Sequence, residues 1–95
     1  MELKFSKKFI RQLERFQYDK KLYRLLAAKI KFIESASSES EISELVQIRK
    51  TNTRFRIKIK ISNRIIYRVG INILHNKIWF ACIENDKKRF YKQFP

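Results

Sequence analysis

The chain has 95 residues, and its 23 Lys and Arg against 9 Asp and Glu give a formal net charge of +14 at pH 7. This length suits one domain spanning residues 1–95, and a hydrophobic fraction of 44% with eight Phe argues against intrinsic disorder. One cysteine excludes an internal disulfide scaffold, so we expect a cytoplasmic protein, and the longest apolar runs are too short to cross a membrane. The excess positive charge favours a polyanionic partner: nucleic acid, an anionic membrane surface or an acidic protein.

The first half of the sequence predicts a short strand followed by two helices. Leu3 and Phe5 alternate with charged neighbours, as in a strand, and Ser6 is a suitable N-cap for the next helix. Asp19 is a suitable N-cap for a second helix, which ends near Ser35. The apolar residues at helical spacing are Phe5, Phe9, Leu13 and Phe16 in the first helix, and Leu22, Leu26, Ile30 and Ile33 in the second. We expect the two helices to form a hairpin, and the basic residues of the first to be a solvated surface.

An acidic connector, residues 38–44, separates the helices from the second half. Ser38 and Glu41 could cap one helical turn there, and Leu45 and Ile48 indicate a short extended segment. This connector holds three of the nine acidic residues of the chain. The rest of the chain is therefore more basic than the net charge of the whole chain suggests.

Arg54 to Ile61 shows the clearest pattern, in which basic and apolar residues alternate as in a strand. A second strand is expected from Arg64 to Ile71. A two-residue turn would scatter the basic residues over both faces, whereas a three-residue loop, Ile61–Asn63, gathers them on one. That loop would pair Lys60 with Arg64 and Arg56 with Arg68. The shared basic face would then hold Arg54, Arg56, Lys58, Lys60, Arg64 and Arg68, with Phe55, Ile57, Ile59, Ile65, Tyr67 and Val69 toward the helices. Like charges that face one another destabilise a bare sheet, so this face favours an anionic partner.

The last third of the chain predicts a turn, a strand and a short tail. Residue types in the segment from Asn72 to Asn76 predict a turn. The apolar run from Ile78 to Ile83, which includes the core residue Cys82, predicts a central strand buried on both faces. Asp86 could cap a last helical turn, and Phe90 or Phe94 could anchor the tail to the core.

Several segments in this order resemble the RelE/ParE superfamily of bacterial type II toxin–antitoxin toxins. They are the opening strand with its Phe-rich basic helix, the stretches Arg54–Ile59 and Arg64–Tyr67, and the ending Tyr91–Pro95. The resemblance covers nearly the whole chain. It implies an α+β, RelE-like fold: an N-terminal strand, a two-helix hairpin, an antiparallel sheet of three to four strands and a short C-terminal tail.

Most members of the superfamily cut messenger RNA, often in the ribosomal A site, whereas ParE-like members poison DNA gyrase. A cognate antitoxin neutralises both. The resemblance implies a metal-independent messenger-RNA endonuclease, ribosome-dependent or free, with the antitoxin, messenger RNA and the ribosome as partners and no membrane partner. The alternative is a non-cleaving gyrase inhibitor or a catalytically decayed toxin. Asp86, where many related sequences carry a histidine, favours the alternative, and the retained Arg56, Arg64 and Tyr91 favour the nuclease.

By position, Arg56 and Arg64 match the arginines that hold the substrate phosphate, and Lys87, Lys88 and Tyr91 match the C-terminal segment that supplies further catalytic groups. An arginine fork suits a phosphoryl group that gains charge, and crowding by like charge could make a lysine a partial base. We therefore predict catalytic roles for Arg56, Arg64, Lys87 and Tyr91, and nucleic-acid binding by Arg54, Lys58, Lys60, Arg68, Lys88 and Arg89.

No metal site or cofactor is expected, because His75 and Cys82 are the only residues of their kinds. A third interpretation is a plain nucleic-acid-binding module that uses the same basic face. Its weakness is that no exposed aromatic residue for base stacking is evident on that face.

Overall fold

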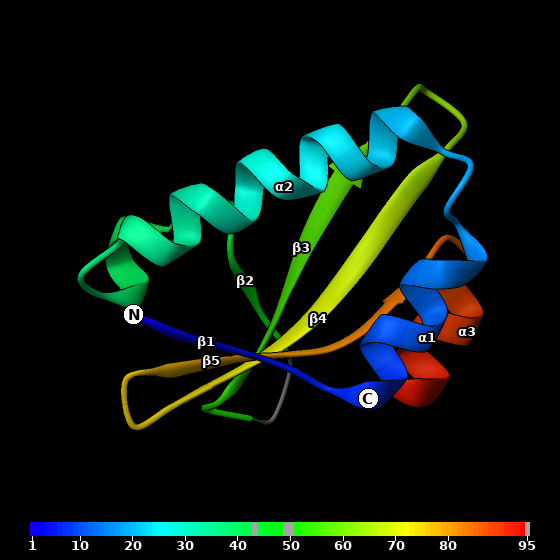
Figure 1. Cartoon of the computed structure of the whole chain (residues 1–95). Helices are drawn as coiled ribbons and strands as arrows, with labels where there is room; N and C mark the ends of the chain where they lie inside the picture. The colour runs from blue at the N-terminus through cyan, green and yellow to red at the C-terminus, as the bar shows by residue number, and fades with distance from the viewer. Residues whose placement is uncertain (43, 49–50, 95) are drawn as a thin grey trace.

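The described part of the chain, residues 1–42, 44–48 and 51–94 of a computed structural model, forms one mixed sheet and three helices. In chain order these are β1 (Glu2–Phe5), α1 (Lys7–Arg15), α2 (Lys20–Ser35), a 3-10 turn (Glu39–Glu41), β2 (Val46–Gln47), β3 (Arg54–Lys60), β4 (Ile66–Leu74), β5 (Lys77–Glu84) and α3 (Lys87–Gln93). Figure 1 shows α2 crossing the twisted sheet, with α1 and α3 close together at one end.

Short polar side chains begin all three helices. Ser6, Asp19 and Asp86 each accept a hydrogen bond from the backbone N–H three residues later, at 3.0, 3.0 and 2.9 Å. Each bond satisfies one of the donors that a helix start leaves unpaired. These three predicted N-caps are confirmed, and the predicted last turn is a helix of seven residues. The prediction for Ser38 is wrong, because its side chain makes no capping hydrogen bond to the 3-10 turn that follows it.

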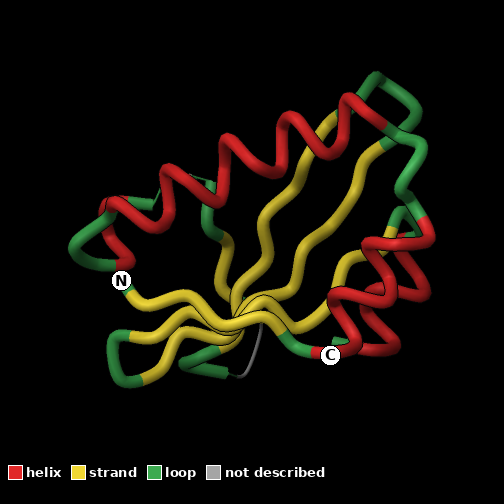
Figure 2. The backbone as a smooth tube through the Cα atoms, viewed as in Figure 1, coloured by secondary structure: helices red, strands yellow, loops and turns green. Residues whose placement is uncertain are grey.

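The sheet has five strands in the order β1-β5-β4-β3-β2. The fold class is confirmed as α+β, but the sheet has one more strand than the three to four predicted. It is also mixed, because β1 pairs with β5 in parallel while the other neighbours are antiparallel. A parallel pair needs a long crossover, and the helices with β2 to β4 lie between these two strands in the chain. Figure 2 shows all five strands converging in one twisted sheet.

The two long helices do not lie side by side as a hairpin. They diverge from the turn at residues 16–19, so that α1 packs against β5 and α2 against β3 (Figure 1). One hydrogen bond, from the Tyr23 hydroxyl to the Leu13 carbonyl at 2.6 Å, joins them near the turn. The apolar stripes predict both helices correctly, but each stripe packs on a different part of the sheet.

The face of the sheet toward α1 and α2 carries the hydrophobic core. The predicted core residues of the two basic strands that are buried there are Phe55, Ile57, Ile59, Tyr67 and Val69. The prediction for Ile65 is wrong, because this residue lies outside β4 and is 44% exposed. Burial of each such side chain contributes about 1.5–3 kcal/mol, so this face supplies most of the stability.

The predicted pairing of β3 with β4 is also wrong. Lys58 lies opposite Arg68 and Lys60 opposite Ile66, so five residues rather than three connect the strands. The Ser62 hydroxyl accepts hydrogen bonds from the backbone N–H groups of residues 64 and 65, at 3.2 and 3.1 Å, which holds these residues in the turn. The shift is two residues, and an even shift keeps every strand side chain on its predicted face.

The turn between β4 and β5 is shorter than the predicted turn segment. β4 continues to Leu74, and His75 and Asn76 form the turn with φ values of 51° and 60°. Two successive residues with positive φ are typical of a tight hairpin turn.

Candidate functional site

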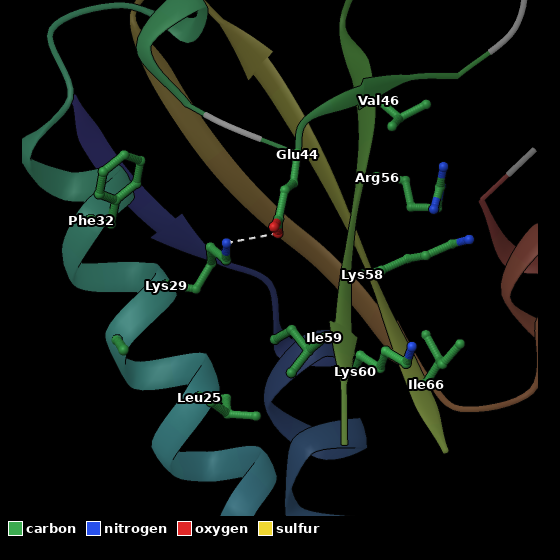
Figure 3. Close-up of a pocket in the computed structure, with 11 residues that line it drawn as sticks. Leu25, Lys29, Phe32, Glu44, Val46, Arg56, Lys58, Ile59, Lys60 and Ile66 are labelled. Atoms are coloured by element: carbon green, nitrogen blue, oxygen red, sulfur yellow. Dashed lines mark hydrogen bonds and ion pairs between the residues drawn. The ribbon is translucent and has the colours of Figure 1, made fainter. Parts of the chain in front are cut away.

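The face of the sheet away from α1 and α2 carries the basic side chains of β3 and β4, and we call it the cationic face. Its basic residues are Arg54, Arg56, Lys58 and Lys60 of β3 and Arg68 of β4. In Figure 3, Arg56, Lys58 and Lys60 extend from the side of β3 opposite to Ile59. Lys58 and Lys60 are exposed, and the three arginines are half-buried. The strand positions of the predicted basic face are therefore confirmed.

α3 packs onto the cationic face through two buried aromatic side chains. Phe90 and Phe94 form a small cluster with Cys82, separate from the main core. A Cβ atom on Gly70 would lie 2.7 Å from a Phe94 ring carbon and 2.9 Å from the Cys82 sulfur. Any larger residue would therefore push α3 away, so the single glycine of the chain permits this close packing.

The docked α3 brings Lys87 to the basic residues of the sheet. Three cations around Lys58 lower its pKa, Arg56 most strongly, with smaller effects from Arg68 and Lys87 and a contribution from desolvation. We call Arg56, Lys58, Arg68 and Lys87 the cationic cluster. The Nε atom of Arg68 is buried and has no hydrogen-bond partner among the described residues. The cluster can hold an anion with two arginine forks and offers a lysine that loses its proton more easily than usual.

Arg64 lies apart from this cluster. It is exposed in the turn between β3 and β4, beyond the last paired residues, Lys60 and Ile66. At about 3.3 Å per residue, the turn is roughly 20 Å along the strand from Arg56. The two arginines predicted to hold one phosphate are therefore well separated along the hairpin.

Other predicted site residues lie around the cluster. Tyr91 is half-buried one turn after Lys87, and its ring contacts that of Phe90 at 4.9 Å between centroids. The Arg54 guanidinium stacks on the Phe94 ring at 5.3 Å, at the other end of α3. Lys88 and Arg89 are exposed on the first turn of α3.

Trp79 is an exposed aromatic residue on the cationic face that sequence reasoning missed. It lies opposite Asn72 and is 42% exposed, so β5 is not buried on both faces as predicted. A β-bulge changes the alternation of faces within this apolar run, because Gly70 pairs with Cys82 and Ile71 with Phe80. Cys82 and Trp79 therefore share the cationic face, where α3 covers Cys82 but leaves Trp79 exposed.

A groove of about 900 Å3 runs between α2 and the edge of β3 (Figure 3). Its lining combines apolar residues with basic ones: Leu25, Ala28, Lys29, Phe32, Glu44, Val46, Arg56, Lys58, Ile59, Lys60 and Ile66. β2 pairs only with Phe55 and Arg56, so no described strand covers the rest of this edge of β3. The strand pattern gave no sign of the groove, because it depends on how α2 crosses the sheet.

A network of hydrogen-bonded side chains joins α1, β5 and α3. The buried Gln12 accepts a hydrogen bond from the Ile83 N–H at 2.9 Å and donates one to Gln93 at 2.5 Å. Glu84 is 2% exposed and accepts from Arg15 and Gln93, both at 3.2 Å. These side chains satisfy one another, and only the folded structure reveals their pairing.

Among residues 1–42, 44–48 and 51–94, no three His, Cys, Asp or Glu side chains lie close enough together to hold a metal ion. In the same residues, no helix is both long and apolar enough to span a membrane. No protein-family profile and no protein of curated function matches the sequence.

The chain shares its fold with a solved structure, a chain from the crystal structure of the RelB–RelE antitoxin–toxin complex of Methanococcus jannaschii. The two are 20% identical, the match covers 97% of this chain and 99% of the other, and the TM-score is 0.73. The fold is therefore RelE-like, as the sequence resemblance implies. At this identity the likeness establishes the fold, and function has to be argued from the site.

Proposed function

We propose that the protein is the toxin of a type II toxin–antitoxin pair and cleaves messenger RNA without a metal ion. The observation that carries this proposal is the placement of Arg56, Lys58 and Arg68 side by side on the cationic face, with Lys87 of α3 near enough to lower the pKa of Lys58. The RelE-like fold supports the toxin role. A cluster of four cations has a high electrostatic cost unless an anion occupies it, and a phosphodiester has the required charge.

Each member of the cluster suits one step of RNA cleavage. Neutral Lys58 accepts the proton of the 2′-hydroxyl, whose oxygen attacks the neighbouring phosphorus while the bond to the 5′-oxygen breaks. Arg56 and Arg68 stabilise the charge that develops on the phosphoryl oxygens. Lys87 donates a proton to the leaving 5′-oxygen, and Tyr91 orients the RNA strand. The products are a 2′,3′-cyclic phosphate and a 5′-hydroxyl, and the reaction needs no histidine at position 86.

Cleavage of RNA by the purified protein, with and without ribosomes and with a metal chelator present, tests the proposal. Arg56→Ala and Arg68→Ala should each lower the rate by about 10²–10³, the effect of removing a donor that stabilises a developing anion. Arg64→Ala should cost about tenfold or less, since a remote phosphate contact contributes only binding. Equal effects of all three substitutions, or full activity in all three, would contradict the assignment. DNA breaks with intact messages would instead indicate the gyrase inhibitor.

We further propose that an acidic, amphipathic segment of the antitoxin occupies the groove between α2 and β3. The apolar side chains there suit the apolar positions of such a segment, and the uncovered edge of β3 offers backbone groups for strand addition. Arg56 and Lys58 belong both to the groove and to the cluster, so an occupied groove would block the substrate.

Co-expression of the toxin with its antitoxin tests this docking site. Phe32→Glu places a charge at an exposed position of the groove, and we expect it to weaken the complex by at least about tenfold, as for a buried interface residue. Ile10→Glu is the matched control, because Ile10 is similarly exposed on α1 but outside the groove. Loss of the complex in both variants, or in neither, would place the antitoxin elsewhere.

A further inference from the structure

A second concave site lies between α1 and α3, on the other side of α3 from the cationic cluster. It has a volume of about 500 Å3, and we call it the α1–α3 cleft. Its lining residues are Lys8, Arg11, Gln12 and Arg15 of α1, Glu84 of β5, and Arg89 and Gln93 of α3. Lys8, Arg11 and Arg15 follow one another by three and four positions, so they lie on one side of α1, facing α3.

The charge of the cleft is unbalanced. Four cations line it against one carboxylate, Glu84, which is buried and already bonded to Arg15 and Gln93. Arg15 also lies over the Phe16 ring, with its guanidinium carbon 5.6 Å from the ring centroid, and its side chain is 52% exposed. Its guanidinium is therefore held in place with donors left for a ligand. Arg11 and Arg89 add two further forks of the kind that bind phosphate oxygens in pairs.

The lining of the cleft favours a nucleic-acid backbone over a protein partner. Every lining residue is polar or charged, whereas protein interfaces need an apolar centre of the kind that the groove beside β3 offers. A phosphate backbone requires only cations and hydrogen-bond donors. The two concave sites therefore differ in the class of partner that they suit.

The first turn of α3 connects the cleft with the cationic cluster. Lys87 contributes to the electrostatic field at Lys58, while Arg89, two residues later, lines the cleft. Lys88 is exposed between them. A chain of phosphates that crosses this turn would meet cations on both sides of the helix. We propose that the α1–α3 cleft is a second phosphate-binding site, which holds the RNA backbone outside the cleavage point.

This inference rests on the proposed action on RNA, and binding measurements can test it independently of cleavage. The cleft variant carries Lys8→Gln, Arg11→Gln and Arg89→Gln, and leaves Arg15 in place to keep the bond to Glu84. The control variant carries Lys20→Gln, Arg24→Gln and Lys31→Gln, which remove the same charge from exposed positions of α2. The probe is fluorescent, 2′-O-methylated RNA, which lacks the attacking hydroxyl, in lengths of about 5 and about 20 nucleotides.

We expect the cleft variant to bind the longer RNA at least about tenfold more weakly, with a salt slope reduced by about 2, because three phosphate contacts are lost. The control variant should lose less than about threefold, and the short RNA should bind both variants alike. Equal weakening by both variants would show a general charge effect and overturn the proposal. Two other results would also overturn the proposal. One is a cleft variant that binds RNA normally but binds the antitoxin more weakly. The other is a cleft that binds inorganic phosphate although its substitutions leave RNA binding unchanged.

Failure of the two proposals can be told apart. If the unmodified protein binds RNA through the cleft but cuts none, the nuclease proposal fails and the proposal of a phosphate-binding cleft stands. If it cuts RNA while the cleft and control variants bind equally, only the cleft proposal fails.

Discussion

The two faces of β3 carry alternate residues of one strand and differ in what covers them. On the core face, Ile57 is 1% exposed and packs among buried neighbours from the sheet and helices. On the cationic face, Lys58 is exposed and opposite another cation, Arg68. Other parts of the chain cover the first face, whereas α3 covers only part of the second, and the proposed function assigns the exposed part to an anionic partner. Stability and function should therefore be separable, residue by residue, along a single strand.

The largest expected effect comes from truncating the core face. Ile57→Ala removes buried methyl groups and leaves a cavity, so it should lower the free energy of unfolding by about 2–5 kcal/mol. The neighbouring change Lys58→Ala should alter this free energy by about 0.5 kcal/mol or less, since the side chain is exposed. Urea denaturation measures both. Similar losses of unfolding free energy in the two variants would contradict the separation of stability on one face from function on the other.

A smaller effect is expected where α3 crosses the cationic face. Gly70→Ala places a methyl group against Phe94 and Cys82, and the strain should cost about 1–3 kcal/mol. Hydrogen exchange should show the loss in α3, with the core strands protected as before, and RNA cleavage should fall because Lys87 moves. Uniform loss of protection throughout the chain would mean that α3 is part of the main core. Normal cleavage with α3 displaced would remove Lys87 from the mechanism.

The smallest expected effect is a change in pH dependence. Neighbouring cations lower the pKa of Lys58, and Arg56 contributes most. A lysine base acts only when deprotonated, so cleavage should increase as pH rises through this pKa. Arg56→Gln removes the main cause, which raises the pKa and should move the rate profile to higher pH. Lys31→Gln, a charge loss on α2, is the control. A profile that stays in place in Arg56→Gln, while overall activity falls, would assign the base to another group.

The sequence predicts the two faces because residue alternation alone decides which side chains share a face of a strand. This holds for Arg56 and Lys58 even though the predicted pairing was wrong by two residues. The position of Arg64 could not be obtained in this way, because it depends on hydrogen bonds to Ser62 within the turn. Trp79 was missed because a continuous apolar run does not show which of its residues the rest of the chain leaves exposed.

The α1–α3 cleft shows a different limit of sequence reasoning. The basic residues of α1 were predicted to be a solvated surface, which is the usual role of charges on a helix. Their position opposite Arg89 depends on α3 packing beside α1, through the contact of Gln12 with Gln93 and through Glu84 of β5, which bonds both Arg15 and Gln93. These side chains are far apart in sequence, and no periodic pattern connects them.

Controlled expression in bacteria, with message 5′-ends mapped over time, tests the central claim most directly. We expect the unmodified protein to stop growth and to produce new message ends within minutes. A variant with Arg56→Ala and Lys58→Ala, folded normally, should produce neither effect. New message ends in this double variant at the unmodified rate, or growth arrest by the unmodified protein with all messages intact, would contradict a cleavage role for the cationic cluster.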